Sequence, residues 1–241
     1  MTENNYKIKI KKAFADNGLS HLINDEKAEK FELLSNLLNE TNKITNLTAI
    51  KDEDGIILKH FIDCASAADC IKEGASVIDI GCGGGFPSLP LAIVREDITI
   101  HSLDSTGKKV DFVNKAIKAL DLKKSKATCG RAEEFITASR ENYDYCISRA
   151  VARMNILSEL CIPFVKVGGK FIAMKSEKGQ EELSEATRGI ESLGGKHEQT
   201  IKDSFTYNES KIERELIIIS KQKPTPNQYP RKYSQILKKP L

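Results

Sequence analysis

Glycine residues gather in one short segment, Gly81-Cys82-Gly83-Gly84-Gly85-Phe86, which follows Asp79 closely. Glycine allows a backbone with positive φ and lets a ligand approach the main chain without a Cβ in the way. A helix that begins after such a turn presents free N–H groups and a partial positive charge to a small anionic group, such as an amino-acid carboxylate. The segment therefore indicates a binding site for a small molecule with an anionic end.

Asp104 ends the next apolar run of the chain. A carboxylate at that place can accept hydrogen bonds from ribose hydroxyl groups. The dinucleotide fingerprint G-x-G-x-x-G is the competing interpretation. It requires glycine at position 86 when read from Gly81, and glycine or alanine at position 88 when read from Gly83; the residues there are Phe86 and Ser88. Because both frames fail, the pattern disfavours a pyrophosphate-containing ligand.

The elements that must position these residues are strands alternating with helices. Apolar, β-rich runs predict strands at 76–80, 98–104, 126–129, 143–148 and 170–175, followed by a hairpin of strands at 201–205 and 214–220. Helical spacing predicts intervening helices at 89–94, 108–120, 132–139, 155–165 and 179–193. Such alternation predicts a doubly wound α/β fold with a mostly parallel sheet, whose ligand lies beyond the carboxyl ends of the strands, where strand order reverses.

Three parts of the chain differ in pattern. Residues 1–70 show helical spacing and are predicted to be an N-terminal helical extension, and residues 71–220 form the ligand-binding domain. Residues 221–241 carry basic side chains and no acid. This tail leaves two interpretations open, a solvated and partly disordered segment or a segment that contacts phosphates.

Composition bounds the class of protein. Hydrophobic residues make up 40% and charged residues 29%, which suits a globular protein with a sizeable core, and a net charge of +3 is too small to prove a nucleic-acid partner. The six cysteines form no CxxC pair, so no disulfide framework or metal site is expected. Without an apolar signal core or a membrane-length apolar run, we expect a cytoplasmic protein with no membrane partner.

Further segments along nearly the whole chain are similar to one family. They are Asn46-Leu47-Thr48-Ala49-Ile50, Lys59-His60-Phe61-Ile62-Asp63, Gly81 to Pro87 with Leu91-Ala92-Ile93, Leu103-Asp104-Ser105 with Lys108-Lys109, Arg131-Ala132-Glu133-Glu134, Ser148-Arg149-Ala150-Val151, and Tyr229-Pro230-Arg231 with Lys239-Pro240-Leu241. The chain resembles the bacterial small-subunit ribosomal RNA guanine-N7 methyltransferases, also called methyltransferase G or glucose-inhibited division protein B. Ser88 and Ser176 depart from the pattern, since glycine is usual at both positions.

The resemblance implies a class I fold with a seven-stranded sheet and S-adenosylmethionine (AdoMet) as cofactor. It implies methylation of N7 of a guanosine in 16S ribosomal RNA, by a monomer that acts on the RNA or on the small ribosomal subunit. Alternatives from other classes are an AdoMet enzyme for another RNA or a small molecule, a nucleotide-dependent oxidoreductase, and a non-catalytic RNA-binding protein.

The resemblance also assigns roles to single residues. Gly81 and Phe86 line the methionine side of the cofactor site, Asp104 holds the ribose, and Ala132 and Glu133 lie beside the adenine. Glu133 has a structural alternative as a solvated acid in the first turn of a helix.

Guanine N7 carries an in-plane lone pair and no proton, so direct in-line transfer needs no base and placement can supply the rate. The resemblance also places Arg149 at the cofactor site, where it borders the position of methyl transfer. Because the product base is cationic, we assign Arg149 to positioning or phosphate contact and not to proton chemistry. The role of His60 stays open. Candidate RNA contacts are Arg131, Arg153, Lys175, Arg231 and Lys232.

Overall fold

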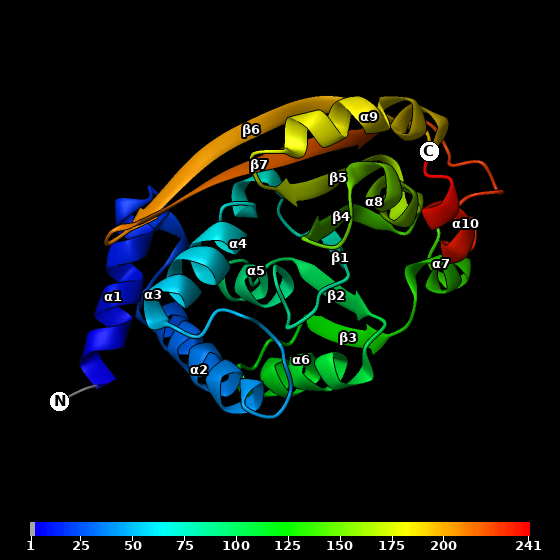
Figure 1. Ribbon diagram of the computed structural model, residues 1–241. Coiled ribbons are helices and arrows are strands. Elements are labelled where there is room, and N and C mark those ends of the chain that lie inside the picture. Colours follow the sequence, from blue (N-terminus) through cyan, green and yellow to red (C-terminus); the bar gives the residue numbers. More distant parts are fainter. Residues whose placement is uncertain (1–2) are drawn as a thin grey trace.

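A seven-stranded sheet runs through the centre of the structure, a computed structural model that describes residues 3–241 (Figure 1). Its strand order is β3-β2-β1-β4-β5-β7-β6. The first five strands pair in parallel, and β7 lies antiparallel between β5 and β6. The strands are β1 (Ser76–Ile80), β2 (Thr99–Asp104), β3 (Ser125–Cys129), β4 (Tyr143–Arg149), β5 (Val165–Lys175), β6 (Gly195–Tyr207) and β7 (Ser210–Lys221). The predicted mostly parallel sheet is confirmed, and strand order reverses between β1 and β4.

Helices cover both faces of the sheet, as a doubly wound fold requires. One face packs on α5 (Ser88–Val94) and α6 (Gly107–Ala119), and the other on α7 (Ala132–Phe135), α8 (Met154–Cys161) and α9 (Gly179–Ser192). Consecutive strand residues alternate between the two cores: Val77 joins the first and Ile78 the second. This alternation follows from the period of two along a strand.

The N-terminal helix α2 (Asp25–Asn42) packs on α5 and α6, which cover the first of these faces, and α1 (Glu3–Asp16) packs on α2 (Figure 1). After a loop, helix continues through α3 (Glu53–Ile56), a π-helical turn at Ile57–Ile62 and α4 (Asp63–Ala65). Buried residues of these helices belong to the same apolar core as one face of the sheet. None of the helices within residues 3–241 combines the length and apolar character that crossing a bilayer requires.

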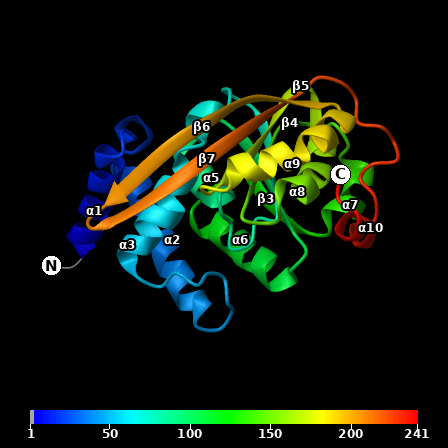
Figure 2. The same cartoon turned by 45° about the horizontal axis from the view of Figure 1, so that its top comes forward.

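The last strands are longer than the sequence predicted. Figure 2 shows the β6–β7 hairpin extending beyond the parallel strands toward α1, where the Asn17 side chain exchanges two hydrogen bonds of 2.8 Å with the backbone of Thr206. Most of β6 is exposed at the sheet edge, so its polar residues carry no apolar run to mark a strand. The predicted helix over 155–165 is also corrected: α8 ends at Cys161, and Pro163 lies in a short 3₁₀ turn before β5.

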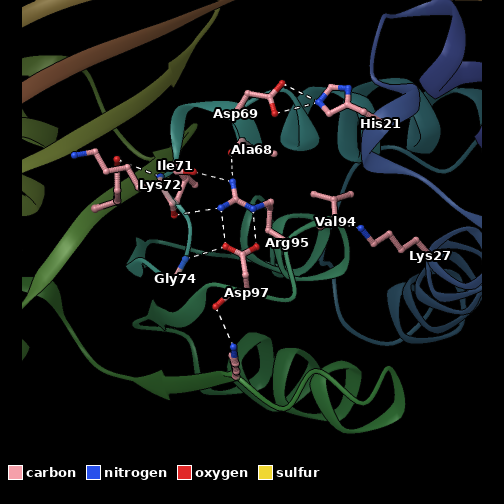
Figure 3. Close-up of polar contacts among 12 residues, drawn as sticks. His21, Lys27, Ala68, Asp69, Ile71, Lys72, Gly74, Val94, Arg95 and Asp97 are labelled. Carbon is pink, nitrogen blue, oxygen red and sulfur yellow. Dashed lines mark hydrogen bonds and ion pairs between the residues drawn. The ribbon is translucent and has the colours of Figure 1, made fainter.

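Arg95 joins three segments of this architecture at the end of α5 (Figure 3). Its guanidinium donates to the carbonyl oxygens of Ala68 at 2.6 Å, Ile71 at 2.7 Å and Lys72 at 3.2 Å, and its Nε donates to Asp97 Oδ1 at 2.7 Å. The Arg95 side chain is only 16% exposed, and it holds the pKa of Asp97 well below its usual range. Arg95 therefore fixes the chain that enters β1 against the loop that enters β2.

We expect Arg95→Ala to lower the free energy of unfolding by about 2–3 kcal/mol, because three carbonyl groups and a carboxylate lose a charged donor. Urea denaturation measures the change. Arg188→Ala, at an exposed position of α9, is the matched control and should shift the free energy by less than about 0.5 kcal/mol. Equal stability of the two variants would contradict the role given to Arg95.

Candidate functional site

A cleft of about 470 Å³ opens at the carboxyl ends of β1, β2 and β4, where strand order reverses. This is the place at which doubly wound sheets bind their ligands. The structure brings to this one cleft all six residues that the sequence predicted as cofactor contacts, namely Gly81, Phe86, Asp104, Ala132, Glu133 and Arg149.

The glycine turn combines an open wall with tight packing behind it. Gly83 lines the cleft with φ +55°, and a Cβ added there would meet no protein atom within 4 Å. Gly85 has φ +86°, and a Cβ there would lie 2.6 Å from Cγ of the buried Leu89. Residue 83 therefore leaves space for a ligand, whereas residue 85 allows the turn to approach α5.

Asp104 connects the end of β2 to this turn. Its Oδ2 accepts a 2.9 Å hydrogen bond from the Gly83 N–H, and its Oδ1 accepts a 2.8 Å hydrogen bond from the Thr106 N–H. Each carboxylate oxygen can accept a further hydrogen bond. Because Asp104 lines the cleft, those remaining positions are available to hydroxyl groups of a ligand.

Asp79 supports the turn from inside the fold. The carboxyl group is fully buried, and its Oδ2 accepts a 3.2 Å hydrogen bond from the N–H of Ser88, the first residue of α5. Burial raises the pKa of Asp79 to about 7, although the hydrogen bonds from Ser88 oppose the shift. The side chain of Ser88, at a position where the family that the chain resembles usually has glycine, is also buried.

Arg149 connects the end of β4 to the N-terminal helices. One guanidinium nitrogen, Nη1, donates to Asp63 Oδ2 at 2.9 Å and to the Lys59 carbonyl at 2.6 Å, while Nη2 donates to His60 Nδ1 at 3.0 Å. The His60 ring stacks on Phe86 with centroids 4.2 Å apart, and the Arg149 guanidinium lies 5.4 Å from the centre of the same Phe86 ring. The sequence did not assign a role to His60. In the structure its side chain lines the cleft.

The hydrogen bonds of His60 fix its tautomer. Since Nδ1 accepts from Arg149, Nε2 carries the proton and donates to Thr48 Oγ1 at 2.8 Å. Thr48 Oγ1 also accepts from the Ile50 N–H. Burial, and then the charge of Arg149, lower the pKa of His60 to about 3. The imidazole is therefore neutral at physiological pH.

We expect His60 to reduce stability as pH falls. In the unfolded chain this histidine has a pKa near 6.5 and becomes protonated between pH 7 and 5. In the folded protein His60 stays neutral over the same range. This contribution is complete above about pH 6.5 and is lost as pH falls toward 3, with about 2 kcal/mol lost between pH 7 and 5. Urea denaturation of the wild type and His60→Gln at both pH values isolates the effect. A His60 NMR signal that titrates near pH 6.5 would contradict the prediction.

Three of the five predicted RNA contacts, Arg131, Arg153 and Lys232, are exposed. Arg131 lines the cleft, and Arg153 forms a 2.7 Å ion pair with Glu185 at the surface. Lys232 precedes α10 (Tyr233–Lys238), whose first residue, Tyr233, also lines the cleft.

Lys175 is occupied within the fold. Its Nζ donates to the Ala152 carbonyl at 2.6 Å and forms a 2.8 Å ion pair with Glu182, whose Oε2 also accepts from the Met154 N–H at 3.0 Å. The Lys175 side chain is 9% exposed. It holds the loop between β4 and α8, which conflicts with the predicted phosphate contact.

Arg231 anchors the C-terminal segment. Its guanidinium pairs with the fully buried Glu159 of α8 through hydrogen bonds of 2.9 Å from Nε and 2.5 Å from Nη2. Ile236 of α10 is also buried. This segment is thus an ordered part of the fold and the interpretation as a disordered tail is wrong. Arg231 neutralises a buried carboxylate, which conflicts with its predicted role as a phosphate contact.

Sequence comparison relates the chain to one family of known proteins. The GidB family, described as rRNA small subunit methyltransferase G, matches residues 27–211. The ribosomal RNA small subunit methyltransferase G of Clostridium botulinum (strain Loch Maree / Type A3) is 48% identical over 222 residues, which cover 90% of this chain and 92% of that protein. The protein of the same name from Clostridium perfringens (strain 13 / Type A) is 43% identical over 236 residues, which cover 96% and 97%.

Solved structures share the fold at much lower identity. M. jannaschii TYW2 in complex with AdoMet has a TM-score of 0.55 and 14% identity, with 66% of this chain and 75% of that chain covered. This likeness shows the architecture alone. The family match spans more than half of the chain, and the relatives align along nearly all of it. The chain therefore belongs to the rRNA small subunit methyltransferase G family.

Proposed function

We propose that the chain transfers the methyl group of AdoMet directly to N7 of a guanosine in 16S ribosomal RNA, without a covalent enzyme intermediate. Family membership makes the chain a ribosomal RNA methyltransferase that depends on AdoMet. The observation that carries the residue roles is the cleft at the reversal of strand order, where the open face of Gly83 and the Asp104 carboxylate lie together.

The residues of this cleft fit AdoMet. Bound there, AdoMet supplies an electrophilic methyl group on a sulfonium. The lone pairs of Asp104 accept hydrogen bonds from ribose hydroxyls, and Ala132 and Glu133, at the start of α7, contact the adenine. Gly81 and the stacked rings of Phe86 and His60 enclose the methionine part and exclude water.

The chemistry needs no proton acceptor, and the imidazole of His60 is not free to act as one. Both ring nitrogens of His60 are occupied, Nδ1 by Arg149 and Nε2 by Thr48. Guanine N7 attacks with a lone pair that carries no proton, so orientation supplies the rate enhancement. Arg149 is a positioning residue that holds the His60–Phe86 wall against β4.

We infer that the protein acts as a monomer on RNA presented by the small ribosomal subunit. Arg131, Arg153 and Lys232 contact phosphates near the cleft, and they give the affinity for RNA a dependence on salt. A small-molecule substrate would not show that dependence.

The test incubates the protein with labelled AdoMet and small subunits from a strain that lacks the modification, and then maps the labelled base. Label at N7 of one guanosine supports the proposal. Label on another atom or on another RNA, or no transfer by protein that binds AdoMet, would sink it. A parallel reaction with protein-free 16S RNA decides between subunit and naked RNA.

We expect Asp104→Ala to weaken binding of AdoMet by about 1–3 kcal/mol, because the ribose loses charged acceptors. Isothermal titration with AdoMet and with its demethylated product measures the affinity. Asp111→Ala, at an exposed position of α6, should bind as tightly as the wild type. Unchanged affinity in Asp104→Ala would count against the ribose role.

A further inference from the structure

Lysine residues are concentrated on one side of the fold, which is formed by α6 and the outer strand β3. The segment 107–129, which contains both elements, has seven lysines and two aspartates and therefore a net charge of +5, whereas the whole chain carries +3. Six of the seven lysines are exposed, and we call the surface that they form the α6–β3 face. These are Lys108, Lys115, Lys118, Lys123, Lys124 and Lys126.

The packing of α6 brings these lysines to one surface. The buried side of the helix leaves an exposed stripe at helical spacing. The stripe consists of Lys108, Asp111, Lys115 and Lys118. Figure 1 shows α6 lying along β3, and the Asn114 side chain exchanges two hydrogen bonds of 3.1 Å with the backbone of Ala127 in that strand. The helix stripe and Lys126 of β3 therefore belong to one continuous surface.

Most lysines of the α6–β3 face lack an anionic partner. All four lysines of α1, by contrast, form ion pairs of 3.0 Å or less with carboxylates. On the α6–β3 face, within the described residues 3–241, only Lys123 forms an ion pair, with Asp121 at 3.4 Å. Two carboxylates beside Lys123, those of Glu26 and Glu96, are already paired with Lys30. The positive charge of this face is thus left for a partner outside the chain.

We propose that the α6–β3 face docks the phosphate backbone of the target ribosomal RNA, outside the cofactor cleft. The proposal rests on the proposed function and states where that RNA lies on the protein. Lysines that neutralise phosphates release counterions and add affinity without reading sequence. Lysine on an edge strand also hinders pairing with another sheet, which would account for Lys126 but not for Lys115 and Lys118 on a helix.

The α6–β3 face adjoins the cleft. Lys109, which follows Lys108, lines the cleft, and so does Arg131, which lies shortly after β3. From there the lysines continue along the helix axis, on which Lys108 and Lys118 lie about 15 Å apart at a rise of about 1.5 Å per residue. Phosphate contacts along this face would therefore orient the RNA, while the cleft selects the base.

A triple variant, Lys115→Gln with Lys118→Gln and Lys126→Gln, removes charge from the face without touching a residue that lines the cleft. We expect it to bind small subunits about tenfold to a hundredfold more weakly. The slope of log affinity against log salt concentration should become shallower by about 2, at about 0.7 for each lost phosphate contact. The single-turnover rate at saturating subunit concentration should stay at the wild-type value, as should the affinity for S-adenosylhomocysteine measured by titration calorimetry.

The matched control is a triple variant of α1, Lys9→Gln with Lys11→Gln and Lys12→Gln. It changes the net charge by the same amount but alters lysines that carboxylates already neutralise, so it should bind small subunits like the wild type. A further variant tests the opposite sign. Asp111→Asn removes the acid from the lysine stripe and should tighten binding to small subunits by about threefold.

Wild-type affinity in the α6–β3 variant would overturn the proposal. An equal loss of affinity in the α1 variant would also overturn it, because the net charge alone would then account for the effect. If the α6–β3 variant loses S-adenosylhomocysteine binding through misfolding, Asp111→Asn decides, and unchanged affinity in that variant would refute the docking face. Failure of the proposed function looks different: wild-type protein would bind small subunits without methylating N7 of a guanosine.

Discussion

Replacing Arg149 with alanine is expected to lower the free energy of unfolding by about 3–5 kcal/mol and methyl transfer by about a hundredfold. Asp63 is 1% exposed and would keep only Arg214 as an ionic partner. Nδ1 of His60 would lose its donor, and Phe86 would lose the guanidinium beside its ring. The stability loss follows from the buried carboxylate that keeps only one of its two cationic partners, and the activity loss follows from the greater mobility of the His60 and Phe86 side chains.

Urea denaturation and single-turnover methylation measure the two effects. Arg214→Ala is the matched control, because it removes the other partner of Asp63 without touching His60 or Phe86. It should destabilise the fold and leave more activity than Arg149→Ala. Arg149→Lys keeps a positive charge but loses the forked guanidinium that reaches Asp63 and His60 together. We therefore expect its activity to lie between those of Arg149→Ala and Arg214→Ala. Full activity of Arg149→Ala would refute the positioning role.

Alanine substitutions at two glycines of the same turn, Gly85 and Gly83, should differ strongly in their effect on stability. In Gly85→Ala the new Cβ lies 2.6 Å from Cγ of Leu89 and 3.3 Å from Cγ2 of Val113, and both side chains are in the core. Overpacking and the positive φ together should destabilise the fold by about 2–5 kcal/mol. In Gly83→Ala the Cβ meets no protein atom, so only the cost of positive φ, about 1–2 kcal/mol, applies.

For AdoMet binding, the substitution at Gly83 should have the larger effect. Because Gly83 lines the cleft, its Cβ takes space that AdoMet needs, and Gly83→Ala should lose more AdoMet affinity than stability. Denaturation midpoints and titration calorimetry on both variants give the comparison. If Gly83→Ala binds AdoMet like the wild type, the cofactor does not approach the backbone at this residue.

The parallel strands and the glycine turn were predictable because their signals are local. A buried parallel strand is a short apolar run, and the run 76–80 ends directly in the glycines. The edge strand β6 has no such run, so its length depended on pairing with β7, which a single sequence does not reveal. The predicted helix over 155–165 was too long at its C-terminal end, because apolar residues continue at helical spacing through the 3₁₀ turn that contains Pro163 and into β5.

The ion pairs of the site could not be read from the sequence. Arg149 meets Asp63 and His60 only after the chain has folded, and the sequence distances carry no sign of that contact. Glu159 resembles a solvated helix acid, yet it is buried and selects Arg231 as partner. Side chains with long stems and single charges have many possible partners, and tertiary packing chooses among them.

Part of the wall of the cleft comes from a segment of the chain that precedes the sheet. Leu47 and His60 reach the cleft from the segment between α2 and α4, whereas the strands and the glycine turn belong to an architecture seen in solved structures of low identity. A small-molecule inhibitor confined to the glycine turn would not reach these two residues. One that extended an aromatic group to the neutral His60 imidazole and to Leu47 would gain contacts that the strands themselves do not provide.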